Sequence, residues 1–363
     1  MILNNLIIEV IITFGITIII NMLIILWHAH NESEVTKRND TKAIQASHVI
    51  PVARIGGLSI IISSVVAATL FFDVHTSWPH YWLILISAFP VFVIGFFEDM
   101  GYLVRPRARI LAAALSGAFF VILTGYWLPH TDIPILDLAM QWAPFGIGFS
   151  IFLAVGVCHS FNLIDGLNGL SGFTAIGVAL SLALISKEVG IYEYFNILLF
   201  ISSAIAGFLV LNFPLGKIFL GDAGAYFIGH ILFWMAISII CVSPNITPFS
   251  MLLIFFWPVA DTLLAIVRRL YLGVPISNPD RLHFHQLVRR GVEIILLGRK
   301  RRHISNPLAT VLILPLIFAP MAVGVSLATN RVESMLACIY FSILFISSYK
   351  ACMWLARRFR NSS

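Results

Sequence analysis

Five acidic residues are the first candidates for chemistry, because each stands near an end of a long apolar run. They are Glu98, Asp99, Asp165, Asp222 and Asp261. An ionisable group at membrane depth is costly and usually has a function. A single one could instead be a helix-end side chain that reaches the interface. Five that converge on one side of a membrane weaken that alternative and predict a site there.

Two of these acids are adjacent. Glu98 and Asp99 end one apolar run and precede a loop that holds Arg105, Arg107 and Arg109. Neighbouring carboxylates can share a divalent ion, or raise one another's pKa until one becomes a usable base. Charge balance against the arginines is the alternative interpretation of the pair.

The segment FNLIDGLNGLSG, residues 161–172, combines polar residues and glycines. The polar residues recur every third position: Asn162, Asp165 and Asn168. On a helix they would share one face. The glycines keep the same spacing: Gly166, Gly169 and Gly172. They allow close approach of a ligand or another helix. Helix packing alone would explain the glycines and leave the polar residues without a role.

Asp222 lies between Gly221 and Gly224 at the start of another apolar run. Mg²⁺ takes one or two protein carboxylates and leaves its other positions to water and phosphate. A single carboxylate at a glycine-flanked helix start is therefore a candidate metal ligand. An aspartate that caps the helix N-terminus is the alternative.

Two basic segments are candidates for phosphate binding. In PDRLHFHQLVRR, His283 and His285 alternate near Arg281, which is typical of a diphosphate-binding loop. Zinc is a weaker alternative, since neither a cysteine nor a third histidine has ligand spacing. A solvated basic loop is the other alternative. In the second segment, Arg54 precedes paired glycines, with His48 in the same loop.

Helices that span a membrane must position these groups. The chain has 363 residues, 59% hydrophobic and 11% charged, against about 25% charged in soluble domains. Long continuous apolar runs demand helices, because lipid cannot satisfy a polar backbone. The sequence predicts an all-α polytopic membrane protein of about eleven spans, near residues 6–27, 56–72, 81–97, 110–126, 142–158, 169–187, 195–211, 223–242, 249–268, 307–327 and 334–353.

The positive charges predict an orientation. With these spans, 20 of the 23 Lys and Arg residues fall on one side, which the positive-inside rule makes cytoplasmic. The N-terminus is then outside, the C-terminus inside and the acidic site cytoplasmic. The net charge of +6 reflects this topology and contact with anionic lipid, and does not indicate nucleic acid. Residues 127–141, without Lys or Arg, are expected on the outer surface.

Residues 1–363 are interpreted as a single integral membrane domain, with the first apolar run retained as a span. The four cysteines have neither metal-ligand nor disulfide spacing and are expected to be small hydrophobic residues. A transporter with buried carboxylates is the rival function. Transporters place their sites near the midplane of repeated halves, whereas these acids lie at one edge and no repeat is visible.

In this order, the motifs resemble those of the polyprenyl-phosphate N-acetylhexosamine-1-phosphate transferases, glycosyltransferase family 4. The resemblance covers about residues 48–290. Many members carry two aspartates at the acidic pair, so Glu98 is a departure. Asn168 stands where the peptidoglycan translocase pattern has an aspartate, and the histidine run is shorter. Both differences favour the branch that initiates O-antigen and other surface polysaccharides.

The resemblance implies roles for the residues that match its motifs. Catalytic roles fall on Glu98, Asp99, Asp165, His283 and His285. Substrate-binding roles fall on Asn162 and Gly166 by the resemblance, and the residue types and spacing described above add His48, Arg54, Asn168 and Arg281. The metal-binding aspartate falls on Asp222. The cofactor implied is Mg²⁺, with Mn²⁺ as an alternative.

The reaction implied is transfer of a sugar-1-phosphate from a UDP-activated N-acetylated sugar to undecaprenyl phosphate, with release of UMP. The chain would be a magnesium-dependent phospho-glycosyltransferase of the bacterial inner membrane, with its active site on the cytoplasmic side. The expected partners are these two substrates and the lipid bilayer, with a homodimer as one option and no nucleic acid.

Overall fold

The structure is a computed structural model that describes residues 2–30, 52–71, 79–275, 282–297 and 302–360. The described residues form helices and one isolated parallel β-bridge between Ala53 and Ile218. The longer helices are α1 (Ile2–His30), α3 (Gly56–Phe71), α6 (Pro106–Thr124), α8 (Ala143–Ile164), α9 (Leu170–Glu188), α10 (Tyr192–Asn212), α11 (Gly221–Val242), α15 (Arg302–Ser326) and α16 (Arg331–Arg360). The shorter ones are α4 (Pro79–Ser87), α5 (Phe89–Asp99), α7 (Pro134–Met140), α12 (Pro248–Ile254), α13 (Phe256–Tyr271), α14 (Phe284–Val292) and the π-helix η1 (Glu293–Leu297).

Eight helices among the described residues are long and apolar enough to cross a membrane, and the count reaches ten if each bent pair is one span. The first pair, α4 and α5, bends by 44°, and the second, α12 and α13, bends by 83°. Each predicted span falls on one of these helices or pairs, except that residues 56–72 become α3, a shorter apolar helix of 16 residues. The polytopic all-helical prediction is confirmed, while the number eleven stays a prediction.

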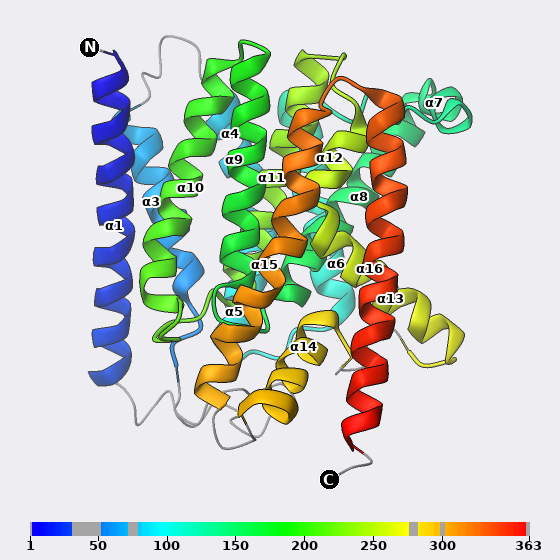
Figure 1. The fold of residues 1–363 in the computed structure, drawn as a ribbon. Coiled ribbons are helices and arrows are strands. Elements are labelled where there is room, and N and C mark those ends of the chain that lie inside the picture. Colours follow the sequence, from blue (N-terminus) through cyan, green and yellow to red (C-terminus); the bar gives the residue numbers. More distant parts are fainter. Residues whose placement is uncertain (1, 31–51, 72–78, 276–281, 298–301, 361–363) are drawn as a thin grey trace.

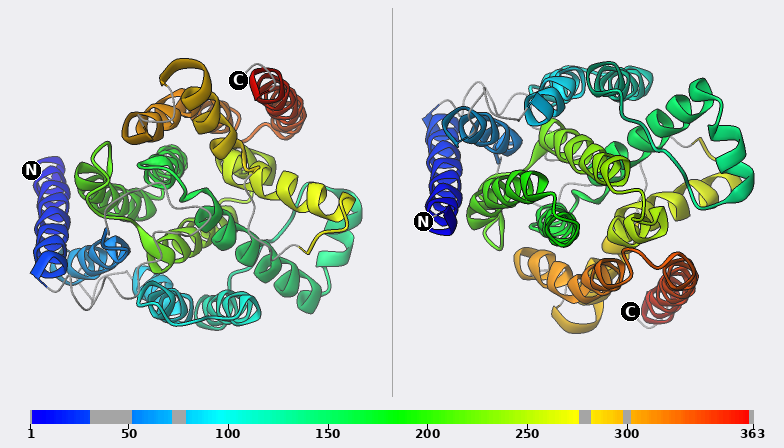
Figure 2. Two further views of the ribbon diagram at one scale, coloured as in Figure 1. Left: turned by 90° about the horizontal axis from the view of Figure 1, so that it is seen from below. Right: turned by 90° about the horizontal axis from the view of Figure 1, so that it is seen from above.

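Helix α11 is the centre of the bundle, and its side chains are buried along almost its whole length. Helices α3, α5, α8 and α9 pack against it, while α1 and α16 lie at opposite sides (Figure 1). Figure 2 shows the same arrangement along the helix axes, with other helices between α1 and α16. Apolarity alone does not explain this central place, because lipid can also cover an apolar helix: α1 is at least as apolar as α11, yet most of its side chains are not covered by protein.

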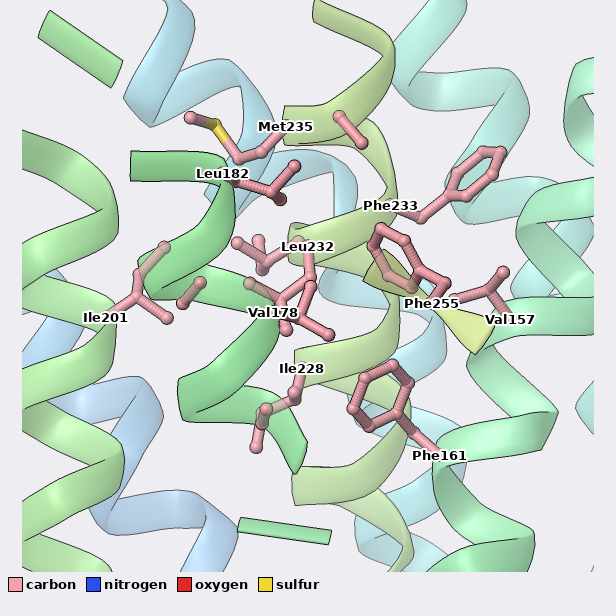
Figure 3. Packing of buried hydrophobic residues seen from close by; sticks show 14 of the residues in the cluster. Val157, Phe161, Val178, Leu182, Ile201, Ile228, Leu232, Phe233, Met235 and Phe255 are labelled. Atoms are coloured by element: carbon pink, nitrogen blue, oxygen red, sulfur yellow. The ribbon is translucent and has the colours of Figure 1, made fainter. Parts of the chain in front are cut away.

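Large apolar side chains from α8, α9, α10 and α11 fill the core. Figure 3 shows Phe161 beside Ile228 and Val178, with Phe255 closing the side towards α12 and α13. The predicted role of the cysteines is confirmed, since all four are free thiols that are buried or partly buried. The core therefore fixes α11 tightly, and the start of α11 carries Asp222.

Candidate active site

Asp99 holds the first turn of α11 from another helix. Its Oδ1 accepts a hydrogen bond from the Asp222 backbone N–H at 2.8 Å, and its Oδ2 accepts one from Ala223 N–H at 2.9 Å. The first N–H groups of a helix have no partners within the helix, and a carboxylate there is favourable. The capping position itself is Leu220, without a side-chain cap. Asp222 is therefore not the N-cap, and its carboxylate is left for other contacts.

Close backbone contact brings α3, α5 and α11 together at this point. A Cβ on Gly57 would lie 2.2 Å from Gly224 Cα, so only glycine permits this crossing. Gly221 has φ +77°, and a Cβ on it would lie 2.6 Å from Asp99 Oδ2. The glycines that flank Asp222 in the sequence are thus required for packing.

Arg54 reaches the same place through a short backbone pairing. The Phe219 N–H donates to Ala53 C=O at 2.9 Å, and the Gly56 N–H donates back to Phe219 C=O at 2.9 Å. This pairing ties the residues before α3 to the residues before α11. Arg54, which is exposed, then faces the acidic residues around Asp222.

The Asn-x-x-Asp motif straddles the end of a helix. Asn162 lies in the last turn of α8, and its Nδ2 donates to Asp222 Oδ1. Helix α8 ends at Ile164, so Asp165 is its C-cap and Asn168 lies in the turn beyond. The prediction that the three polar residues share one helical face is wrong, because the glycines at 166 and 169 end the helix inside the motif. Burial raises the pKa of Asp165 well above its usual range, and the charge of Asp222 raises it further.

Glu98 pairs with an arginine of the following helix. Its Oε1 lies 2.5 Å from Arg109 Nη2, and the two side chains are 19% and 29% exposed. Its second oxygen, Oε2, is buried and has no hydrogen-bond partner among the described residues. The ion pair supports the charge-balance interpretation for one oxygen and leaves the other available.

The charges converge on one aspartate. The Asp222 carboxylate is close enough for its charge to act on Glu98, Asp99 and Asp165, and Arg54 acts on the same three with opposite sign. We call Glu98, Asp99, Asp165 and Asp222 the Asp222 cluster. It comes from α5, the end of α8 and the start of α11. The described residues contain no group of three or more His, Cys, Asp or Glu side chains already arranged as metal ligands.

The histidine motif folds against a second aspartate. Asp261 Oδ2 lies 3.1 Å from His283 Nδ1 and 3.5 Å from His285 Nδ1, while its Oδ1 accepts the Phe284 N–H at 2.9 Å. The two imidazole rings stack with centroids 5.6 Å apart, and both are buried. We call Asp261, His283 and His285 the Asp261 cluster. This cluster explains why the histidines alternate, because the residues before and after Phe284 both contact the Asp261 carboxylate.

One glycine joins the two clusters. A Cβ on Gly166 would lie 2.6 Å from His285 Nε2 and 3.1 Å from Gln286 Nε2. His285 therefore stands directly against the turn that holds Asp165. Burial lowers the pKa of His285, and Asp261 acts in the opposite direction. The structure thus brings five sequence motifs into one region.

Three predicted binding residues, Asn168, His48 and Arg281, are not placed in either cluster by the described part of the structure. Asn168 is buried, and its Nδ2 donates to Pro214 C=O at 3.1 Å while its C=O accepts from Thr310 Oγ1 at 2.8 Å. The first bond joins the turn to the segment between α10 and α11, and the second joins it to α15. A substrate contact for Asn168 stays a prediction. His48 and Arg281 lie outside the described residues.

Sequence reasoning left two residues without a role. Asp261 was one of five acids at span ends, but its spacing of 22 residues from His283 gives no local signal. Arg109 was named only together with Arg105 and Arg107, as a positive-inside charge and as one possible charge-balance partner, and the structure shows that it is the one that pairs with Glu98. Its position in the first turn of α6, one loop after Glu98, was the available signal.

Comparison with known proteins agrees with this arrangement. Residues 81–240 match the family described as Glycosyl transferase family 4. The chain is 31% identical over 236 residues to a probable undecaprenyl-phosphate N-acetylglucosaminyl 1-phosphate transferase of Bacillus subtilis (strain 168), covering 64% of each chain. It is 28% identical over 193 residues to a phospho-N-acetylmuramoyl-pentapeptide-transferase of Thermotoga petrophila, covering 51% of this chain and 60% of that protein.

A third relative is the undecaprenyl-phosphate alpha-N-acetylglucosaminyl 1-phosphate transferase of Yersinia pestis, 26% identical over 247 residues, with 65% of each chain covered. In all three, the match spans less than two thirds of the relative's length. The matched region holds Glu98, Asp99, Asp165 and Asp222, and the part of this chain that forms the Asp222 cluster is therefore a glycosyl transferase family 4 region.

Proposed function

We propose that this chain transfers a sugar-1-phosphate from a UDP-N-acetylhexosamine, or a derivative, to undecaprenyl phosphate and releases UMP. An oxygen of the lipid phosphate forms a bond to the β-phosphorus of the donor. The bond from that phosphorus to the bridging oxygen breaks, and the electron pair leaves with UMP. Two relatives are undecaprenyl-phosphate N-acetylglucosaminyl 1-phosphate transferases by name, and a third is a phospho-N-acetylmuramoyl-pentapeptide-transferase. Initiation of a surface polysaccharide such as O-antigen is the proposed context.

The Asp222 cluster is the observation that carries the proposal. Four carboxylates meet, and Arg54 and Arg109 are the arginines among the described residues whose charge acts on them. Such an arrangement is unfavourable unless cations or protons offset it. A reaction between two phosphate groups needs the same cations, because positioning and charge neutralisation supply most of its catalysis.

The donor set suits Mg²⁺, with Mn²⁺ as an alternative. Carboxylate oxygens are the ligands that Mg²⁺ prefers, and one or two are enough when phosphates supply the rest. Asp222 would hold the ion, and the donor phosphates and water would supply its other ligands. Bound Mg²⁺ would supply neutralisation of the donor diphosphate and of the departing UMP.

The other side chains divide the remaining work. Both Asp99 oxygens already accept α11 N–H groups, so Asp99 holds α11 in place. Glu98, with one oxygen unused, is the better candidate to orient the acceptor phosphate or take its proton. Arg54 adds positive charge towards the donor, and His285 supports the Asp165 turn from behind.

The proposal includes a place in the cell: the bacterial inner membrane, N-terminus outside, C-terminus inside and site cytoplasmic. The distribution of Lys and Arg supports it. Helix α1 also begins at the end of the bundle opposite to the one where α16 ends (Figure 1). A reporter fused after Arg360 should read cytoplasmic, and one within residues 127–141 should read external. The reverse result would overturn the orientation.

The direct test is reconstitution. The purified chain is incubated with undecaprenyl phosphate, Mg²⁺ and a panel of UDP-sugars, and UMP release and the lipid product are measured. We expect UMP with at least one UDP-N-acetylhexosamine, and none after chelation of the metal. A transporter with buried carboxylates would release no UMP with any donor, and that result would contradict the proposal.

A further inference from the structure

Four buried polar atoms without hydrogen-bond partners among the described residues gather beside the Asp222 cluster. They are Glu98 Oε2, Arg109 Nε, His159 Nε2 and the Tyr226 hydroxyl. Their helices α5, α6, α8 and α11 pack against one another. We call these four side chains the Tyr226 pocket. A buried polar group without a partner costs about 1–3 kcal/mol, so four in one place point to a ligand that completes them.

The pocket lies one helical turn deeper than Asp222. Asn162 of α8 donates to Asp222 of α11. Three residues back on α8 is His159, and four residues forward on α11 is Tyr226. Residues three and four apart share a helix face, so these two form the next layer, with ring centroids 5.3 Å apart. One turn is about 5.4 Å, which keeps the pocket within reach of groups bound at Asp222.

Two atoms of the pocket donate and two accept. His159 Nδ1 lies 2.9 Å from Val155 C=O, and a carbonyl only accepts, so Nδ1 carries the proton and neutral Nε2 has a lone pair. Glu98 Oε2 also accepts. Arg109 Nε–H donates, and the Tyr226 hydroxyl donates its own hydrogen, while its oxygen lies within hydrogen-bond reach of the Arg109 side chain. A ligand for this pocket must offer both acceptor and donor oxygens.

Tyr226 is buried, whereas Glu98 and Arg109 are partly exposed. The Tyr226 ring is 1% exposed and packs against Val91, Ala113 and Cys158. Glu98 and Arg109 keep 19% and 29% of their side chains exposed. The Tyr226 hydroxyl therefore lies on the buried side of these four groups, and the two charged residues lie on the solvent side.

We propose that the Tyr226 pocket binds the phosphate monoester group of the lipid acceptor. Two phosphate oxygens accept from Arg109 Nε and the Tyr226 hydroxyl. The hydroxyl of a singly protonated phosphate donates to Glu98 Oε2 or His159 Nε2. This inference rests on the proposed function and adds Arg109, His159 and Tyr226 as acceptor-binding residues. A phosphate here lies beside Asp222, where the donor β-phosphorus is expected.

Two other occupants would use the same atoms. The donor diphosphate offers phosphate oxygens, and a single ordered water could accept twice and donate twice. Neither requires the acceptor to bind here, and the test below separates them.

The test compares Tyr226→Phe with Tyr81→Phe, a matched control. Tyr81 is also a buried tyrosine, but its hydroxyl donates to Ser64 C=O at 3.1 Å, away from the cluster. Binding of undecaprenyl phosphate is measured in detergent without donor, and KM is then measured for each substrate. Because a hydrogen bond to a charged group contributes about 1.5–3 kcal/mol, Tyr226→Phe should raise the acceptor Kd and KM by about ten-fold or more. The donor KM and the unfolding temperature should not change.

Two results for Tyr226→Phe would overturn the inference. An unchanged acceptor Kd means that water or packing alone occupies the pocket, and a raised donor KM assigns it to the diphosphate. His159→Asn should weaken acceptor binding in the same direction, and Tyr81→Phe should not. If the wild-type chain binds undecaprenyl phosphate but releases no UMP, the proposed reaction fails while the binding comparison still decides this inference. If the wild-type chain does not bind that lipid, the inference fails.

Discussion

The Asp222 cluster and the Asp261 cluster both centre on an aspartate near a helix end, yet their hydrogen bonding differs. Both oxygens of Asp261 are occupied, by the Phe284 N–H and by His283. In the Asp222 cluster, four carboxylates share a small volume, and Glu98 Oε2 has no partner among the described residues. Asp261 is also fully buried, whereas Asp222 is partly exposed.

This difference indicates that the Asp261 cluster stabilises the fold and that the Asp222 cluster takes part in the reaction. A buried carboxylate whose oxygens are all bonded fixes the chain around it, and removing its charge weakens the fold. Neighbouring, partly exposed carboxylates repel one another, and their charged forms are favourable together only when cations bind. We therefore expect changes at Asp222 to affect turnover, and changes at Asp261 to affect stability as well.

The largest effect on turnover is expected for Asp222→Asn. The substitution keeps the acceptor oxygen for Asn162 but removes the charge proposed to hold Mg²⁺. A metal contributes several kcal/mol to such reactions, so UMP release should fall by more than about 100-fold. The unfolding temperature should stay equal or rise, because one repelling charge is lost. Glu188→Gln, at an exposed acid on α9, is the control, and near-wild-type turnover of Asp222→Asn at saturating Mg²⁺ would refute the assigned role.

Asp261→Asn should reverse this pattern. Asparagine has one acceptor oxygen, and its amide nitrogen only donates. It therefore cannot accept from both His283 and the Phe284 N–H, and a buried donor is left unpaired at a cost of about 1–3 kcal/mol. The unfolding temperature should fall, and UMP release should fall with it. Thermal unfolding of both asparagine variants in the same detergent checks the comparison. Equal unfolding temperatures would mean that the two clusters do not differ in kind.

Variants of His283 and His285 test how much the Asp261 cluster contributes to the reaction. His283→Ala and His285→Ala should each lower UMP release by about 10- to 100-fold, because each removes a partner of Asp261. His285→Ala also removes the contact between this cluster and the turn at Gly166. Arg299→Ala and Lys300→Ala should change it little, since these residues are expected only to set topology. Similar losses from both pairs would remove the distinction between the motif and the basic loop.

The outline of the fold and site follows from the sequence because both depend on local patterns. Apolar runs predict the helices, and charges at their ends identify Glu98, Asp99, Asp165 and Asp222. What the sequence does not predict is tertiary. The bonds from Asp99 to α11 join residues 123 apart in the chain, and nothing in either segment specifies its partner. The sequence also does not predict that α8 ends within the Asn162–Asn168 motif. The three-residue spacing of the polar residues favours a continuous helix, whereas the glycines at 166 and 169 end it.

The contact between the clusters can be tested with a single methyl group. Gly166→Ala places a Cβ 2.6 Å from His285 Nε2, and His285 cannot move freely because Asp261 faces its other side. Overpacking of this kind costs about 1–3 kcal/mol, so turnover should fall about ten-fold. Gly156→Ala on α8 is the matched control, since a Cβ there meets nothing within 4 Å. Equal activities of the two variants would show that the clusters do not depend on this contact.

The smallest effect should come from Glu98→Asp, and it tests whether Glu98 belongs to the reaction or only to the ion pair with Arg109. Aspartate keeps the charge and shortens the reach by about 1.5 Å, one C–C bond. That shift should break the 2.5 Å contact with Arg109, yet leave a carboxylate beside Asp222. Turnover should therefore fall by less than in Gly166→Ala, and well short of the roughly 100-fold that a misplaced catalytic group can cost.

Glu98→Gln separates the two roles. If Glu98 only balances Arg109, the amide should keep most activity, because partly exposed ion pairs contribute about 0–1 kcal/mol. If its unpartnered oxygen orients the acceptor phosphate or takes its proton, Glu98→Gln should be much slower than Glu98→Asp, although glutamine is closer in size. UMP release from the three purified proteins, with acceptor binding measured separately, ranks them. Wild-type turnover in Glu98→Gln would move the search for a proton acceptor to Asp165, because both oxygens of Asp99 already bind the start of α11.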